Sequence, residues 1–378
     1  MIIKQISLII SLTCNLDCKY CYEIHKIDHQ FMSFERAKSI LSFEMKDIKD
    51  GDKVAIEFFG GEPFLGWPLI KQVVEYSLKK YPKKVTFLAT TNGTCLTAEI
   101  KKWLYKYREI FHVSVSIDGI REAHNLNRVY RSTAVGSYDA IDQDFFLNTY
   151  DDPCLKMTIA PNAVSMMSAG IIELLKKGFH VEATLAVGNI DWSNNCNQQK
   201  ILIKELNTLI QFYTEHPEYE TVRFLNTPVE AILESNYSNC RYCGAGKRMH
   251  CYTGNELNWT PCQGFSSITI GTKSKQFEKY DFENYEEPED SICKKCRLNA
   301  VCARCWGTNY AATGSIHYTK PANCSVNRIL IMAGCKILFN RLQNQDHEGN
   351  DYKRKMKAIA LIMDAINDSE AKFLSDSL

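Results

Sequence analysis

Short apolar runs alternate with amphipathic stretches through the first 226 residues. Candidate strands are Ile3–Ile10, Val54–Phe59, Val85–Thr90, Val113–Ile117, Leu155–Ala160, Val181–Val187 and Val222–Leu225. Candidate helices are Ser33–Met45 with Ser33 as N-cap, Pro68–Lys80, Thr97–Tyr107, Ser165–Lys177 and Gln198–Tyr213. Repeated strand–helix alternation predicts an α/β fold with parallel strands and outer helices, as an open sheet or a barrel. Such folds place their chemistry in the loops after the strands.

The pattern stops near Asn226, and cysteine dominates the next part of the chain. Nine of the sixteen cysteines lie between residues 240 and 324, which is typical of a small domain with a partly inorganic core. Helical periodicity returns from Val326, with a polar break at residues 344–350. We therefore expect three parts: a barrel over residues 1–226, a cysteine-rich domain over 227–325 and C-terminal helices over 326–378.

Composition excludes several classes of partner. Lys and Arg number 45 against 44 Asp and Glu, so no charge excess indicates nucleic acid or an anionic membrane. No apolar run approaches ~20 residues, and the N-terminus is too short for a signal peptide. Cysteines in such a chain indicate metal ligands in a reducing compartment, and we expect a cytoplasmic protein.

Cys14, Cys18 and Cys21 follow the first candidate strand and are separated by three and then two residues. Three cysteines can bind three irons of one iron–sulfur cube and leave the fourth iron open. A zinc half-site or a reactive pair is the alternative interpretation, because a single C-x-x-C is common by chance.

Further motifs stand at the ends of later candidate strands. Gly60-Gly61-Glu62-Pro63 offers close backbone approach and a carboxylate, and Thr91-Asn92-Gly93 and Ser116-Ile117-Asp118-Gly119 add hydroxyl, amide and carboxylate groups. Arg128 or Arg131 can hold a ligand carboxylate by a two-pronged hydrogen bond. Because parallel strands end at one edge of a sheet, these groups should meet.

Cys14, Cys18 and Cys21, followed in order by these strand-end motifs, resemble the radical S-adenosylmethionine (SAM) superfamily, most closely its members that modify peptides and proteins. The resemblance covers roughly residues 5–190. It implies a partial (β/α)6 TIM-like barrel, a [4Fe–4S] cluster and SAM, which is cleaved to a 5′-deoxyadenosyl radical. Carried over, the cluster ligands are Cys14, Cys18 and Cys21, and the SAM-binding residues are Tyr20, Gly60, Gly61, Glu62, Pro63, Asn92, Ser116 and Arg128.

The later cysteines resemble the SPASM domain, which holds two auxiliary [4Fe–4S] clusters. The resemblance assigns Cys240, Cys243, Cys262 and Cys305 to auxiliary cluster I, with Cys251 as a substitute for Cys240 or Cys243. It assigns Cys293, Cys296, Cys302 and Cys324 to auxiliary cluster II. Two spacings depart from the family, Gly254 to Cys262 and Cys302 to Cys305. By spacing alone, two zinc ions fit as well.

Three functions compete. The first is a maturase that cross-links a ribosomally made peptide, with a thioether favoured over a carbon–carbon bond, because Cys14 to Lys26 resembles maturases of cysteine-repeat peptides. The second is an anaerobic sulfatase-maturing enzyme that forms formylglycine, although Gln263 stands where that family has aspartate. The third is a zinc-bearing scaffold protein.

The first function implies a precursor peptide and an external electron donor of flavodoxin or ferredoxin type. Thirteen residues precede Cys14. We therefore expect no fused leader-recognition domain, and either a separate recognition protein or leader docking on the barrel and C-terminal helices.

Overall fold

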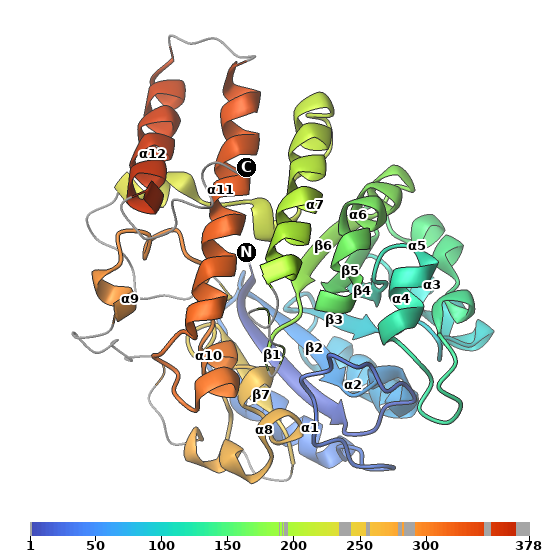
Figure 1. The fold of residues 1–378 in the computed structure, drawn as a ribbon. Coiled ribbons are helices and arrows are strands. Elements are labelled where there is room, and N and C mark those ends of the chain that lie inside the picture. The colour runs from blue at the N-terminus through green and yellow to red at the C-terminus, as the bar shows by residue number, and fades with distance from the viewer. Residues whose placement is uncertain are drawn as a thin grey trace.

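Seven parallel strands form one sheet in the computed structural model of the protein, which describes residues 2–188, 190, 192, 196–233, 243–254, 258–278, 282, 292–343 and 349–367. The strands are β1 (Ile2–Ser11), β2 (Lys53–Gly60), β3 (Val85–Thr91), β4 (Phe111–Ser116), β5 (Cys154–Ile159), β6 (His180–Leu185) and β7 (Met249–Tyr252). Their order is β6-β5-β4-β3-β2-β1-β7, so β6 and β7 are the edges of the sheet (Figure 1). The predicted α/β class with parallel strands is confirmed.

Helices follow most strands and cover the outside of the sheet (Figure 1). They are α1 (Phe34–Glu44), α2 (Trp67–Lys80), α3 (Ala98–Tyr107), α4 (Arg121–Asn127), α5 (Gln143–Thr149), α6 (Met167–Lys176), α7 (Cys196–Glu215), α8 (Ser267–Ile270), α9 (Ile292–Lys295), α10 (Trp306–Thr313), α11 (Pro321–Gln343) and α12 (Asn350–Asn367). Ser33 caps α1 as predicted, because its side chain accepts a hydrogen bond from the Arg36 N–H.

The two faces of the sheet differ in polarity because side chains alternate along a strand. On the helix-covered face, Phe58, Phe87 and Phe111 are fully buried, and the Phe58 ring stacks on the other two at centroid distances of 6.2 and 5.7 Å. Each such burial contributes about 1.5–3 kcal/mol. The other face carries polar side chains, including Glu57 on β2 and Lys156 on β5, and these line cavities.

Strand β7 was not predicted from the sequence. It pairs with β1 in parallel register, Gln5 opposite Met249, and so brings chain from beyond residue 226 into the sheet. The buried Glu44 of α1 accepts hydrogen bonds from His250, at 2.7 Å, and from Tyr252. The predicted strand at Val222–Leu225 was wrong, because Arg223–Leu225 is a single 3-10 turn beside the end of β6.

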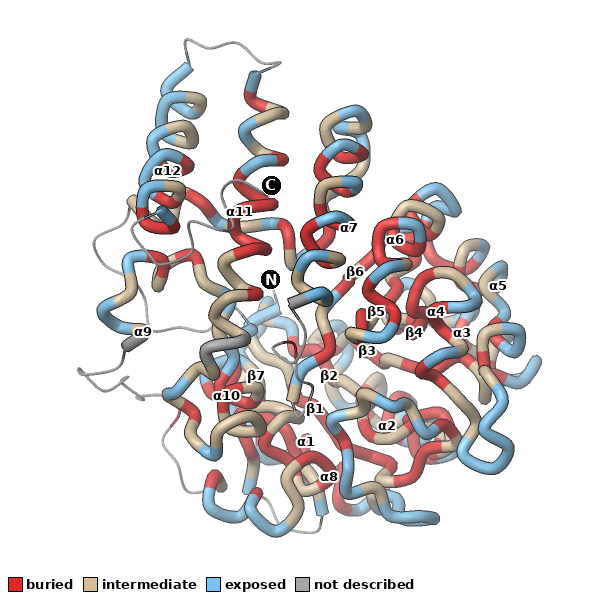
Figure 2. The backbone as a smooth tube through the Cα atoms, in the orientation of Figure 1, coloured by how far each residue is buried: buried red, intermediate tan, exposed pale blue. Residues whose placement is uncertain are grey.

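The C-terminal helices pack beside the barrel. Helix α11 lies along α7 and α12 (Figure 1), and residues 329–335 in its middle are all buried (Figure 2). It begins five residues before the expected Val326, so Cys324 belongs to its first turn. Within the described residues, no helix is long and apolar enough to cross a membrane.

Candidate functional site

The three N-terminal cysteines lie in one cavity of about 700 Å3, a size typical of small-molecule sites. The loop after β1 carries all three, and the ends of β2 to β6 supply most of the remaining wall. The predicted site residues in this wall are Cys14, Cys18, Tyr20, Cys21, Gly60, Gly61, Glu62, Asn92, Ser116, Arg128, Cys243. Pro63 is buried beside it, in the first turn after Glu62.

Gly60 and Gly61 let the cysteine loop lie directly against β2. Gly60 has a φ of +136°, and a Cβ on it would lie 2.0 Å from the carbonyl oxygen of Ser11. A Cβ on Gly61 would lie 2.3 Å from the carbonyl oxygen of Thr13. The Gly61 and Glu62 N–H groups donate to these same two oxygens at 2.9 Å. The glycine pair therefore fixes the path of the chain into Cys14.

Glu62 is buried and its carboxylate is used by the protein itself. It accepts hydrogen bonds from the Phe64 N–H at 3.0 Å, the Thr91 hydroxyl at 2.8 Å and the Asn92 N–H at 2.8 Å. Burial raises the pKa of Glu62 to about 6, against the lowering effect of these donors. Its side chain joins the ends of β2 and β3 below the cysteine loop.

Asn92 connects β3 to the cysteine loop. Its side-chain amide donates to the Asn15 side chain at 2.8 Å and lies 4.0 Å from the Cys14 sulfur. Its oxygen accepts from the N–H and hydroxyl of Thr94. Thr94 in turn accepts from Asn15 at 2.7 Å. Asn92 therefore orients the loop as well as lining the cavity.

Arg128 and Tyr20 meet at Asp118. The Arg128 Nε donates to the Asp118 carboxylate at 2.9 Å, the Tyr20 hydroxyl donates to the same oxygen, and the guanidinium lies 5.5 Å from the Tyr20 ring centre. The other Asp118 oxygen accepts from the Thr158 N–H. Arg131 instead pairs with exposed Asp28 and is not among the cavity residues. The geometry favours Arg128 over Arg131 as a ligand-binding group.

Hydrogen-bond donors lie beside the sulfurs of Cys14 and Cys21. The Leu16 N–H donates to the Cys14 sulfur at 3.5 Å, and the Lys26 ammonium donates to the Cys21 sulfur at 3.0 Å. Burial raises the pKa of Cys14 to about 12 and that of Cys18 to about 11. Such thiols ionise readily only beside a strong positive charge such as iron. Donors to sulfur and an open cavity beyond them fit a cluster with one open iron.

No three His, Cys, Asp or Glu side chains of the described residues are grouped so that they could hold one metal ion. A cube bound by three cysteines has a different requirement, since each sulfur binds a different iron.

The cysteines of the later region fall into two groups. The first group is Cys243, Cys262 and Cys305. The pKa of Cys262 is raised chiefly by burial and next by the thiols of Cys305 and Cys243, which lie near it. Gly264 and Gly307 bring the two segments together: a Cβ on Gly264 would lie 3.5 Å from both the Gly307 Cα and the Cys262 sulfur. Cys240, also predicted for this group, lies outside the described residues.

Cys251, the predicted substitute ligand, is 1% exposed on β7. Cys251 packs against Ile9 and Ile268. Burial raises the pKa of Cys251 most, and the neighbouring Cys262 thiol is the next largest cause.

The second group collects Cys293, Cys296, Cys302 and Cys324. Burial raises the pKa of Cys302 to about 12, and the other three thiols act in the same direction. Asn327 donates to the Cys302 sulfur at 3.6 Å, and the Cys293 thiol donates to Thr319 at 3.5 Å. The structure thus brings together the same four cysteines that the resemblance to the SPASM domain assigned to auxiliary cluster II.

Several cavity residues were missed from the sequence. Glu57 stands alone as a charge in the apolar run of β2, a signal that could have identified it. Lys26 and Glu23 belong to the cysteine loop, and Lys156 comes from β5. Gln263 follows Cys262 and reaches back to donate to Glu57 at 2.6 Å. The last contact joins two parts of the chain and could not be read from spacing.

Comparison with protein families gives one matching model, the radical SAM superfamily, over residues 8–142. An uncharacterized protein of Methanocaldococcus jannaschii is 29% identical over 161 residues, which cover 42% of this chain and 54% of the relative. The radical SAM cyclopropyl synthase TigE of Paramaledivibacter caminithermalis is 34% identical over 32% of this chain and 28% of its own length. A cysteine-type anaerobic sulfatase-maturating enzyme of Clostridium perfringens is 32% identical over 30% of this chain and 32% of its own length. The matches thus span about half of the first relative and about a third or less of the others.

Solved structures resemble this fold over a longer stretch. The structure of anSMEcpe with bound AdoMet has a TM-score of 0.62 at 18% identity, over 95% of this chain and 99% of that chain. Streptococcus suis SuiB bound to its precursor peptide SuiA has a TM-score of 0.53 at 13% identity, over 84% and 74% of the two chains. The predicted TIM-like fold, followed by a cysteine-rich region, is confirmed.

Proposed function

Because residues 8–142 form a domain of the radical SAM superfamily, we propose that this chain is a radical SAM enzyme that cross-links a ribosomally made peptide. A [4Fe–4S] cluster on Cys14, Cys18 and Cys21, with SAM on its open iron, would supply a 5′-deoxyadenosyl radical. The observation that carries the proposal is the single cavity in which these cysteines face Gly60, Asn92, Ser116 and Arg128. We propose that the barrel of residues 1–226 carries out this radical chemistry. Strand β7, from the cysteine-rich part of the chain after residue 226, completes its sheet.

The chain's own residues would hold and shield the cofactor. Tyr20 would lie against the adenine and Ser116 against the ribose. The backbone from Gly60 to Pro63 would receive the methionine ammonium, with Glu62 holding that segment in place. Asp118 fixes the Arg128 guanidinium, which retains N–H groups for the methionine carboxylate. Enclosure matters because a carbon radical reacts with stray hydrogen donors.

Two auxiliary [4Fe–4S] clusters complete the proposal. The grouping of Cys243, Cys262 and Cys305 supports auxiliary cluster I, with Cys240 or Cys251 as its fourth ligand. The grouping of Cys293, Cys296, Cys302 and Cys324 supports auxiliary cluster II. Cys243 lines the same cavity as the radical-site cysteines, so auxiliary cluster I would border the reacting substrate and accept its second electron.

The proposed substrate is a cysteine-bearing precursor peptide, and the proposed product is a thioether, with a carbon–carbon bond as the other outcome. An external flavodoxin- or ferredoxin-type donor would supply electrons. Leader recognition falls either to a separate protein or to the barrel and C-terminal helices. A pull-down with this chain alone distinguishes the two, since tight precursor binding excludes the need for a partner.

Sulfatase maturation is the second candidate, favoured by the relative in Clostridium perfringens. The aspartate that would serve as base in that family is Gln263 here, and an amide that donates to Glu57 cannot take up a proton as a carboxylate does. A cysteine-containing sulfatase peptide converted to formylglycine would establish this activity.

Iron analysis and SAM cleavage test the proposal together. Anaerobically reconstituted protein should hold about twelve irons per chain, as three full cubes require. The triple variant Cys14→Ala, Cys18→Ala, Cys21→Ala should keep about eight irons and form no 5′-deoxyadenosine when reduced with dithionite and SAM.

Cys335→Ala is the control, because this buried α11 thiol belongs to neither group. Four irons with two zincs would overturn the auxiliary clusters. SAM cleavage by the triple variant would overturn the radical site. Cysteine-rich peptides encoded beside this gene are the substrates to assay.

A further inference from the structure

Glu57 presents one free carboxylate oxygen inside the barrel. Its hydrogen bonds all reach Oε2, from the Gln5 amide at 2.9 Å, the Gln263 amide at 2.6 Å and the Ser7 hydroxyl. Within the described part of the chain, Oε1 accepts none, and it is not among the oxygens sealed away from solvent. Three donors on one oxygen hold the carboxylate in a fixed orientation with Oε1 available.

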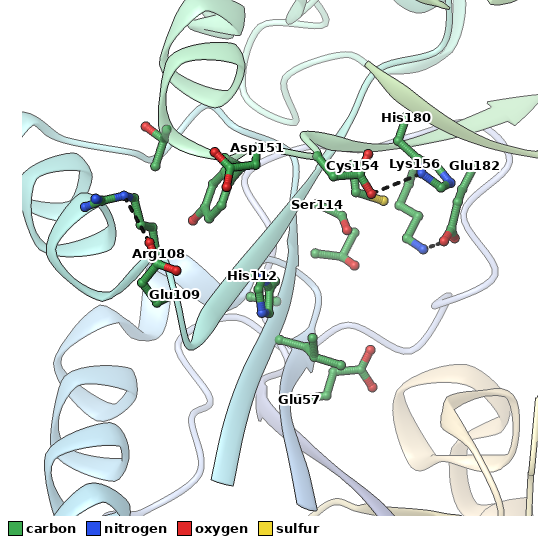
Figure 3. A pocket seen from close by; sticks show the side chains of 16 residues that line it. Glu57, Arg108, Glu109, His112, Ser114, Asp151, Cys154, Lys156, His180 and Glu182 are labelled. Carbon is green, nitrogen blue, oxygen red and sulfur yellow. Dashed lines mark hydrogen bonds and ion pairs between the residues drawn. The ribbon is translucent and has the colours of Figure 1, made fainter. Parts of the chain in front are cut away.

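The residue stands where two cavities meet. It lines the cavity of the three cysteines and a second cavity of about 530 Å3, and Leu88, Thr90 and Lys156 line both. The second cavity is lined by residues from the opposite, amino-terminal ends of the inner strands, such as His112 and His180 (Figure 3). Glu57 thus has the reaction cavity on one side and a separate polar cavity on the other.

The surroundings of Glu57 favour uptake of a proton through burial, whereas the neighbouring positive charge opposes it. Burial raises its pKa, while Ser7, Gln5, the Lys156 charge and Gln263 act in the opposite direction. Lys156 is itself paired with Glu182 of β6 (Figure 3). The other titratable groups beside Glu57 are Tyr22 from the cysteine loop and Cys251 from β7. A carboxylate whose pKa lies nearer neutrality is the better general base.

We propose that Glu57 takes the proton from the reacting thiol of the substrate and releases it to solvent through the second cavity. The proposal rests on the thioether-forming function above. In this step the S–H bond breaks, the sulfur keeps the electron pair and the proton bonds to Oε1 of Glu57. Release on the far side lets the proton leave without opening the radical cavity to water.

Glu57→Gln tests this role, with Glu99→Gln as the matched control because Glu99, in the first turn of α3, is exposed and lines neither cavity. The substrate is the peptide that supports 5′-deoxyadenosine formation by the unaltered enzyme. At pH 7, Glu57→Gln should bind this peptide and cleave SAM normally but form cross-links about 10²–10⁴-fold more slowly. Glu99→Gln should match the unaltered enzyme.

The pH profile distinguishes a base from a structural residue. Cross-linking by Glu57→Gln should recover about tenfold per pH unit up to about pH 8.5, where a cysteine thiol ionises unaided. Near-normal cross-linking at pH 7, an unchanged pH profile, or loss of peptide binding and SAM cleavage would each overturn the role of Glu57. Absence of any peptide product from the unaltered enzyme would instead count against the proposed function.

Discussion

Gly61→Ala should displace the radical-site cysteine loop without disturbing the rest of the protein. The new Cβ would lie 2.3 Å from the Thr13 carbonyl oxygen and 3.0 Å from the Cys14 Cβ. Real Cβ contacts begin near 3.0 Å. The Thr13 carbonyl oxygen must therefore move about 0.7 Å away from its present 2.3 Å distance to the new Cβ. The atom it meets first is backbone, which cannot rotate away as a side chain can.

The cost follows from overpacking and lost hydrogen bonds. Overpacking costs about 1–3 kcal/mol, and weakening the 2.9 Å bond from the Glu62 N–H to Thr13 costs about 1 kcal/mol more. We expect a loss of about 2–4 kcal/mol in the free energy of unfolding, concentrated where Cys14 is held. Anaerobic urea unfolding measures this loss, and iron analysis should show about four irons fewer per chain.

Gly66→Ala is the control in the same segment. Its Cβ would come no closer than 3.4 Å to Phe31 and 3.5 Å to Ile10, which are ordinary contacts. Stability and iron content should therefore stay near those of the unaltered protein. Gly61→Ala protein with full iron content and normal SAM cleavage would refute the reasoning that this glycine fixes the loop.

Two further predictions concern the arginines and the β7 contact. Arg128→Ala should abolish measurable SAM binding in equilibrium dialysis, whereas Arg131→Ala should leave it unchanged, because its exposed pair with Asp28 contributes about 0–1 kcal/mol; equal effects would contradict the choice of Arg128. Glu44→Gln should lower the free energy of unfolding at pH 7 by about 3–5 kcal/mol, because the Glu44 carboxylate anchors β7 to α1. Burial raises the pKa of this carboxylate, but His250, Lys4 and Tyr252 lower it to about 2. Unchanged urea unfolding of that variant would show that β1 alone holds β7.

The sequence by itself determined the fold class and predicted many of the residues that line the first cavity. Apolar runs of the right length predicted seven strands, six of which are present, because a buried parallel strand needs a continuous apolar segment. The strand-end motifs could be placed in one site because parallel strands end at one edge. The resemblance to the SPASM domain, rather than the spacing, divided the later cysteines into two groups.

Tertiary structure decided how these groups are used. Strand β7 has only four residues, and pairing with β1 rather than intrinsic preference makes it a strand. The choice of Arg128 over Arg131 depends on which one reaches Asp118, and that contact spans helix α4. Glu62 looked like a ligand group but is occupied by Phe64, Thr91 and Asn92. The position of Glu57 between two cavities depends on how six strands curve around a common interior, a relation that no local pattern encodes.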